Sequence, residues 1–219
     1  MELSQESSPS PLRLIMTLGI AGFFSGLVLV SVYLSTLPII EANKAAALKE
    51  AVFLVVPGCK SFKTLVMRGK KLVVQTNEGN TKQEKKKDAA EKIFVCYDDT
   101  DKIIGFAIPG GEPGFQDLIK GILGYNADQK IIIGFEVLES RETPGLGDKI
   151  MKDDTFRANF KALAVEPEIT VVKPGTREAN HEVETITGAT ISSKAVIRLL
   201  QKSMTRWRPV IADWVASQN

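Results

Sequence analysis

TGATISSKAV, residues 187–196, is typical of a tight turn that opens a helix. Gly188 permits the turn and a close approach by a ligand, because it has no Cβ atom. A helix N-terminus has unpaired N–H groups and a positive partial charge, so it is a natural seat for a phosphate. A simpler interpretation is that Thr190, Ser192 and Ser193 only cap the helix by accepting hydrogen bonds from its first amides.

RETPGLGD, residues 141–148, is the second candidate site. It follows the strongest strand pattern in the chain, at 129–138, and precedes a predicted helix. Pro144-Gly145 fixes a turn, and the glycines on either side of Leu146 bring the backbone close to whatever lies above it. An ordinary strand-to-helix connection would also account for this stretch.

An uncharged and largely apolar run covers residues 14–40, directly after Arg13. About 20 apolar residues suffice for a helix to cross a bilayer, so we expect a transmembrane helix at 13–40. Residues 1–12 are polar and are expected to be disordered. A cleaved signal peptide is the alternative, although its apolar region usually has only about 7–15 residues. Positive charges lie on both sides of the run, so charge gives only a weak indication of orientation.

Residues 41–219 are expected to form one domain of the α+β class with a largely antiparallel sheet, because strands and helices do not alternate regularly. Helices are predicted at 38–56, 153–164 and 192–217, with a stop at Pro57-Gly58 and a kink or an end at Pro209. Strands are predicted at 62–67, 72–75, 92–97, 102–108, 129–138 and 169–172. The first four strands are expected to pair as two hairpins, with turns at 68–70 and 98–101.

Charge and composition argue against several classes of function. The net charge is only +2, which gives no basis for nucleic-acid binding. The most basic stretch, 82–87, includes Glu84 and is expected to be a solvated loop or helix face. The single histidine, His181, is expected at the surface, and a zinc or iron–sulfur centre built from this chain alone is not expected. Cys59 and Cys96 could pair as a disulfide in an oxidising compartment, but two unpaired thiols are favoured.

Glu142-Thr143-Pro144-Gly145-Leu146-Gly147, followed some forty residues later by Thr187-Gly188-Ala189-Thr190, resembles the FMN-binding domain family. This family includes the G subunit of the Rnf electron-transport complex and the C subunit of the sodium-translocating NADH:quinone reductase. The resemblance extends to the single N-terminal anchor, the size of the domain and the order of the two motifs. Length favours the Rnf protein, because its quinone-reductase relative is usually longer by an insertion.

The resemblance implies a covalently bound cofactor. In the family, the last Thr of the second motif carries FMN through a phosphoester bond, and this Thr corresponds to Thr190. A separate flavin transferase makes the bond, using FAD and magnesium. We expect Ser192, Ser193 and nearby amides to bind the phosphate.

The resemblance also implies a site for the flavin ring. The family's first motif contacts the isoalloxazine ring and corresponds to residues 142–147, where we expect Thr143 and Leu146 to set the ring environment. An upstream Gly-Tyr-Trp-Gly segment of the family is replaced here by Gly114-Phe115-Gln116-Asp117, so no stacking role is assigned to it.

The location and partners follow from the same resemblance. The N-terminus is expected in the cytoplasm, and the domain on the extracytoplasmic face of the inner membrane. Electrons would pass between neighbouring membrane subunits of an Rnf-type ferredoxin:NAD oxidoreductase, so no acid–base or nucleophile pair is expected. Two other classes remain open, a structural subunit without flavin and a membrane-tethered module that binds a small anion.

Overall fold

The computed structural model describes residues 10–69, 71–75 and 92–218. The chain divides into two compact units, 1–46 and 47–219, each of which is described by itself. Most of the segment predicted to be disordered and all of the basic stretch 82–87 lie outside the described residues. Pro11 and Leu12 are described, and both are helical rather than disordered.

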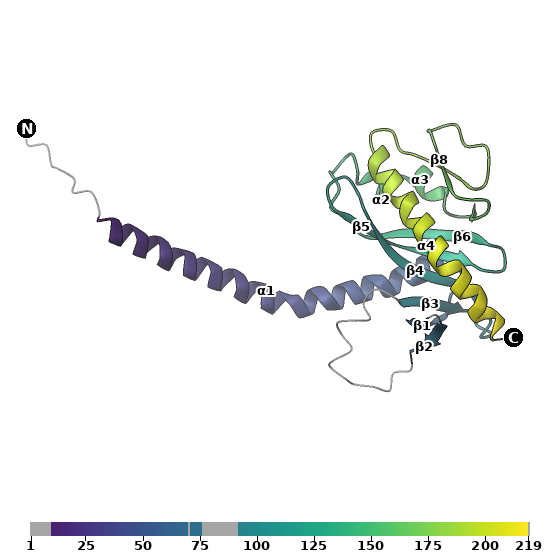
Figure 1. Cartoon of the computed structure of the whole chain (residues 1–219), viewed down its shortest axis with the longest axis horizontal. Helices are drawn as coiled ribbons and strands as arrows, with labels where there is room; N and C mark the ends of the chain where they lie inside the picture. Colours follow the sequence, from purple (N-terminus) through teal and green to yellow (C-terminus); the bar gives the residue numbers. More distant parts are fainter. Residues whose placement is uncertain (1–9, 70, 76–91, 219) are drawn as a thin grey trace, which may run out of the picture. The chain divides into compact units, whose positions relative to one another are not determined.

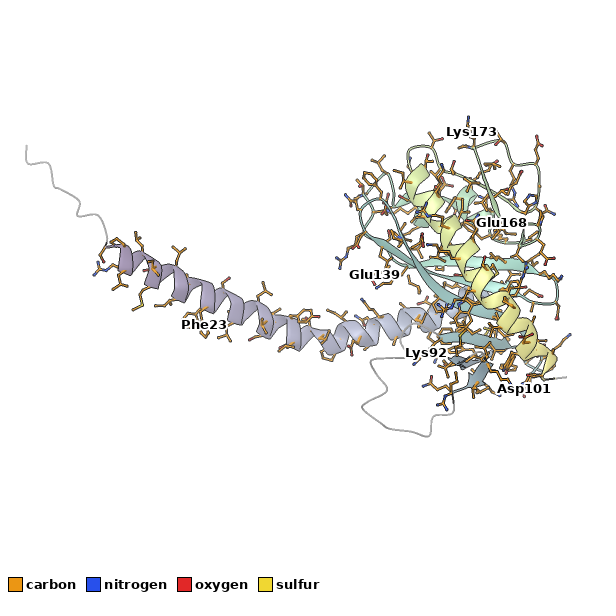
Figure 2. All side chains as sticks on the ribbon, in the orientation of Figure 1. Phe23, Lys92, Asp101, Glu139, Glu168 and Lys173 are labelled. Atoms are coloured by element: carbon orange, nitrogen blue, oxygen red, sulfur yellow. The ribbon has the colours of Figure 1, made fainter. Side chains whose placement is uncertain are left out.

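Helix α1 spans Pro11–Val55, so the apolar run and the helix predicted at 38–56 are a single element. In the first unit its large apolar side chains point outward and are exposed, as Figure 2 shows for Phe23. Among the described residues it is the one helix long and apolar enough to cross a membrane. Its backbone bonds lie within the segment, as a bilayer core requires. The helix therefore fits a membrane anchor.

The last turns of α1 belong to the second unit. Ala51, Val52 and Val55 are buried there, and the helix ends at Val55, just before the predicted stop at Pro57-Gly58. One side of these last turns is therefore buried in the domain, while Leu54 remains 59% exposed.

The domain is built on a seven-stranded sheet in the order β2-β1-β3-β4-β5-β6-β7 (Figure 1). Every neighbouring pair in it is antiparallel, which confirms the predicted class. The strands are β1 (Ser61–Arg68), β2 (Lys71–Val74), β3 (Lys92–Tyr97), β4 (Ile103–Pro113), β5 (Leu118–Asn126), β6 (Ile131–Glu139) and β7 (Leu163–Ala164). A separate parallel pair consists of β8 (Thr170–Val172) and β9 (Glu182–Glu184).

The two faces of the sheet are covered by different helices. Helix α4 (Thr190–Ala216) lies across one face (Figure 1), and its side chains Val196, Leu199 and Leu200 share the larger core with Phe106. The end of α1 packs on the other face, where Val52 and its neighbours meet a smaller apolar cluster. Alternate residues of the central strands serve the two cores, since successive side chains in a strand point to opposite faces.

Strand β5 and the extended end of β4 were not predicted from the sequence. Glycines at positions 121 and 124 interrupt the apolar pattern of β5, and glycine generally weakens a strand. The structure gives Gly124 a reason: it pairs with Gly134 of β6, and a Cβ atom on either residue would collide with the backbone of Val55. These glycines let the end of α1 lie directly on the sheet.

The helix predicted at 153–164 is wrong in its second half. The structure has two short helices, α2 (Lys149–Lys152) and α3 (Asp154–Ala158), after which the chain turns and enters β7. The buried Asn159 ends α3, because its side-chain amide donates to the carbonyl oxygens of Thr155 and Phe156 at 3.1 and 3.0 Å. The apolar spacing correctly predicted burial, since Phe156 and Phe160 pack with ring centroids 5.1 Å apart.

Helix α4 begins two residues before its predicted start. Pro209 lies inside it and does not end it, so this part of the prediction is wrong. Burial of Trp207, Ile211 and Trp214 on both sides of the proline keeps the helix on the sheet.

Candidate functional site

The N-terminus of α4 is formed by the turn at residues 187–190. Gly188 adopts a φ of +81°, a conformation open mainly to glycine, and the amide of Ala189 donates to the carbonyl oxygen of Ile186 at 3.0 Å. Thr190 is the first helical residue, and both Thr187 and Thr190 are exposed. The amides of the first helical turn have no carbonyl partner within a helix, so they are available beside Thr190.

The two serines that follow turn inward. The Ser193 hydroxyl is fully buried, accepts a hydrogen bond from the amide of Ile186 (3.1 Å) and donates to the carbonyl oxygen of Ala189 (2.9 Å). The Ser192 hydroxyl, 2% exposed, donates to the carboxylate of Glu142. Neither hydroxyl caps the first amides of the helix, so the capping interpretation is wrong for these two serines. Both hydroxyls are therefore occupied by protein partners.

The loop at residues 142–147 lies directly beside this helix start. Pro144 and Gly145 are exposed at its tip, and the amide of Leu146 donates to the carbonyl oxygen of Thr143 at 3.1 Å. The Leu146 side chain is 51% exposed, and its Cδ2 lies 3.8 Å from where a Cβ atom on Gly188 would be. The structure thus brings together the two stretches singled out in the sequence.

Glu142 connects three separate segments. Its Oε1 accepts hydrogen bonds from the amides of Phe115 (2.9 Å) and Gln116 (3.1 Å), in the turn between β4 and β5, and its Oε2 accepts from the Ser192 hydroxyl. A Cβ atom on Gly114 or Gly147 would clash with this carboxylate, so both glycines are needed for the close fit. The carboxylate holds the turn, the loop and the start of α4 in one arrangement.

The environment of Glu142 keeps it ionised. Burial leaves the residue 6% exposed and by itself raises the pKa of the carboxyl. The hydrogen bonds from Ser192 and from the amides of Gln116 and Phe115 outweigh that effect and lower the pKa below its ordinary value. The carboxylate is enclosed by protein groups and supports the turn, the loop and the start of α4.

Exposed apolar side chains lie on the three segments that Glu142 joins. Phe115 is 66% exposed on the turn held by Glu142, and Ile191, next to Thr190, is 52% exposed. With Leu146 they form what we call the apolar rim, defined as Phe115, Leu146 and Ile191. Sequence reasoning withheld a role from Phe115 and did not consider Ile191. The sequence pattern that could have indicated them is an apolar residue in an unexpected place: Phe115 lies within a polar turn, and Ile191 lies in the first turn of a helix.

A cavity of about 310 Å³ lies behind the turn, and Thr187 forms part of its wall. Its other walls come from α2, α3 and β9, which sequence analysis did not connect with this site. The lining residues include Lys149, Asp153, Asn159, Glu184 and Thr185.

Elsewhere, His181 is partly exposed. Within residues 10–69, 71–75 and 92–218, no group of three or more His, Cys, Asp or Glu side chains could hold a metal ion.

An exposed threonine at a helix start, beside a Gly-rich loop and an apolar rim, is chemically suited to a phosphate-bearing, partly apolar ligand. Residues 114–205 match the family model described as the FMN-binding domain, and this range contains every residue of the site. This stretch of the chain is therefore similar to the FMN-binding domain family.

The similar curated proteins are G subunits of ion-translocating complexes. The chain is 27% identical over 187 residues to the G subunit of the proton-translocating ferredoxin:NAD(+) oxidoreductase complex of Clostridium ljungdahlii, covering 85% of this chain and 86% of the relative. It is 34% identical to the G subunit of the sodium-translocating ferredoxin:NAD(+) oxidoreductase complex of Acetobacterium woodii, over 43% of this chain and 45% of the relative. It is 30% identical to the G subunit of the ion-translocating oxidoreductase complex of Methanosarcina acetivorans, over 60% and 63%. The match thus spans less than two thirds of two of these relatives.

Two solved structures share the fold. NqrC of Shewanella oneidensis has a TM-score of 0.61 and 24% identity, covering 77% of this chain and 94% of that one. The C subunit of the sodium-translocating NADH-quinone reductase of Parabacteroides distasonis has a TM-score of 0.57 and 21% identity, covering 77% and 93%.

Proposed function

We propose that this chain is a membrane-anchored flavoprotein subunit that carries FMN through a phosphoester bond to the Thr190 hydroxyl. One observation carries the proposal: the exposed Thr190 stands at the N-terminus of α4, beside the apolar rim. A helix N-terminus suits the phosphate, and exposed apolar side chains suit one face of a flavin ring. The similarity to the G subunits supports the same function.

The residues of the site have separate tasks in this proposal. Thr190 supplies the oxygen of the ester, and the amides of Ile191 and Ser192 face the phosphate oxygens. Thr143 and Leu146 of the loop, with Phe115 of the neighbouring turn, form the surroundings of the ring. Glu142 positions them without touching the ring. FMN supplies the redox chemistry when bound, since a flavin exchanges one or two electrons.

The proposed place of the protein is an Rnf-type ion-translocating ferredoxin:NAD oxidoreductase complex, in which it passes electrons between neighbouring membrane subunits. Residues 13–40 form the membrane anchor, the N-terminus is cytoplasmic, and the domain from residue 41 onward is extracytoplasmic. A flavin transferase attaches the FMN during maturation. The long apolar helix and the names of the relatives support this assignment.

The intact mass of the protein purified from its native membranes tests the covalent bond. We expect a gain equal to FMN less one water, together with yellow fluorescence that survives denaturation. Thr190→Ala should remove both signals. Thr187→Ala is the matched control, because Thr187 is also exposed on the same turn, and it should keep both. An unmodified wild type, or a modified Thr190→Ala protein, would contradict the proposal.

A C-type component of a sodium-translocating quinone reductase is the second candidate, since two such proteins share the fold. Copurification distinguishes the two candidates. A complex that reduces NAD with ferredoxin supports the G-type assignment, and one that reduces quinone with NADH supports the C-type. A structural subunit or an anion-binding module would show no covalent flavin in either case.

A further inference from the structure

Two cysteines that are far apart in the sequence lie together in the structure. Cys59 follows the end of α1, and Cys96 lies in β3 opposite Phe62 of β1. The residues that follow them are directly joined, since the amide of Lys60 donates to the carbonyl oxygen of Tyr97 at 2.8 Å. Both cysteines are free thiols in the structure and belong to the same smaller apolar cluster, where the Cys59 thiol donates to the carbonyl oxygen of Ser61 at 3.4 Å. The backbone thus brings the two cysteines to the same part of this cluster.

The surroundings of the pair are apolar and only partly open. Cys96 is fully buried in the smaller core, and Cys59 packs against that core while remaining partly exposed. Burial raises the pKa of the Cys96 thiol far above its ordinary value, and the neighbouring Cys59 raises it further. A buried thiol of this kind is inert toward solvent, so reaction with an external oxidant has to begin at Cys59.

We propose that Cys59 and Cys96 form an intramolecular disulfide in the mature protein. The inference rests on the extracytoplasmic location given under the proposed function, because disulfides persist in oxidising compartments. The oxidant is a disulfide, carried by a protein or a small molecule of that compartment. One S–S bond forms between the two cysteines as their S–H bonds break, and the two electrons and two protons reduce the oxidant to two thiols.

The bond would strengthen the junction between the anchor and the domain. It links the segment that leaves α1 to β3, a strand in the interior of the sheet. A cross-link between residues this far apart restricts the unfolded chain, so reduction of the full-length protein should lower its Tm by roughly 5–15 °C. Cys59→Ser should have the same Tm with and without reductant.

Alkylation of the full chain, purified from its native membranes, tests the bond directly. The protein is quenched in acid, unfolded and treated with N-ethylmaleimide, and its intact mass is measured. We expect no label without prior reduction and two labels after it. Cys59→Ser is the control and should take one label at Cys96 without reduction. Two labels on the unreduced wild type would overturn the proposal.

A second labelling separates failure of the pair from failure of the proposed orientation. Lys173 is exposed in the domain (Figure 2), so Lys173→Cys, in a chain lacking both native cysteines, reports on the side of the membrane. A membrane-impermeant maleimide applied to intact cells should label it. Free native thiols with a labelled Lys173→Cys would overturn the disulfide alone. Free thiols with an unlabelled Lys173→Cys would overturn both inferences.

Discussion

The turn between β4 and β5 lies next to two buried glutamates, which are held in different ways. Glu112, at the end of β4, is 6% exposed, as is Glu142. Two cations from α4 hold Glu112: Lys202 contacts both carboxylate oxygens at 2.8 Å, and Arg198 contacts Oε1 at 3.2 Å. Neutral donors hold Glu142.

The two carboxylates differ in how easily water can substitute for their interactions. The partners of Glu112 are long side chains that reach solvent, since Lys202 is 69% and Arg198 43% exposed. If the Glu112 carboxylate is removed, water can solvate both cations. The donors to Glu142 are fixed by the backbone and by a buried hydroxyl, and they have no comparable substitute. We infer that Glu142 defines the geometry of the site, whereas Glu112 secures α4 on the sheet.

Removal of each carboxylate tests this difference with the largest expected effect. Glu142→Ala leaves two turn amides and the Ser192 hydroxyl without their acceptor, and we expect it to lower the free energy of unfolding by about 3 kcal/mol. Glu112→Ala releases two cations into water and should cost about 1 kcal/mol. Denaturant unfolding of the full chain in detergent measures both values. Equal losses would mean that the two carboxylates are held equally firmly.

Acid should remove the contribution of both carboxylates, an effect of about 1 kcal/mol each, and salt should distinguish them. Burial raises the pKa of both carboxyl groups. Hydrogen bonds from Lys202 and Arg198 outweigh this effect at Glu112, and the neutral donors outweigh it at Glu142, so both pKa values lie below the ordinary one. Each carboxylate therefore stabilises the fold above the unfolded-state pKa, about 4.3. This stability is lost as the pH falls through the folded-state pKa.

The salt arm of that experiment uses Glu112→Gln and Glu142→Gln. At 1 M salt the screening length is only about 3 Å, so the contribution of Glu112 should shrink. The contribution of Glu142 should remain, because its donors are uncharged. Thermal unfolding at neutral pH and near pH 3.5, in low and high salt, measures both contributions. An equal salt effect on the two variants would contradict the assignment of neutral and ionic partners.

Much of this arrangement was predictable from the sequence, because it depends on local patterns. The helix at the N-terminus follows from an uncharged run, and the two hairpins follow from their turn residues. The start of α4 follows from the glycine and hydroxyl residues around Thr190. The family resemblance, rather than a local pattern, assigned residues 142–147 and Thr190 to one flavin site.

The supporting contacts were not predictable in the same way. The bond from Ser192 to Glu142 joins residues 50 positions apart, and the turn that completes the site exists only because β5 pairs with β4. The glycines of β5 concealed that strand, since they are explained only by distant residues: Val55 approaches Gly124, and the Phe135 ring approaches Gly121. A single sequence shows residue types and spacing, whereas these contacts depend on how distant segments pack.

Substitutions in the apolar rim should have the smallest effect on stability. They test most directly whether the geometry that Glu142 fixes serves to place a flavin ring. Phe115 and Leu146 are largely exposed, so replacing either with Ala should change the free energy of unfolding by less than about 0.5 kcal/mol. Val74→Ala is a matched control, because this exposed apolar residue lies in the edge strand β2. If the rim faces the flavin ring, the absorbance and fluorescence of the bound FMN will change in the two rim variants and not in Val74→Ala. Identical spectra in all three would place the ring away from the surface that Glu142 organises.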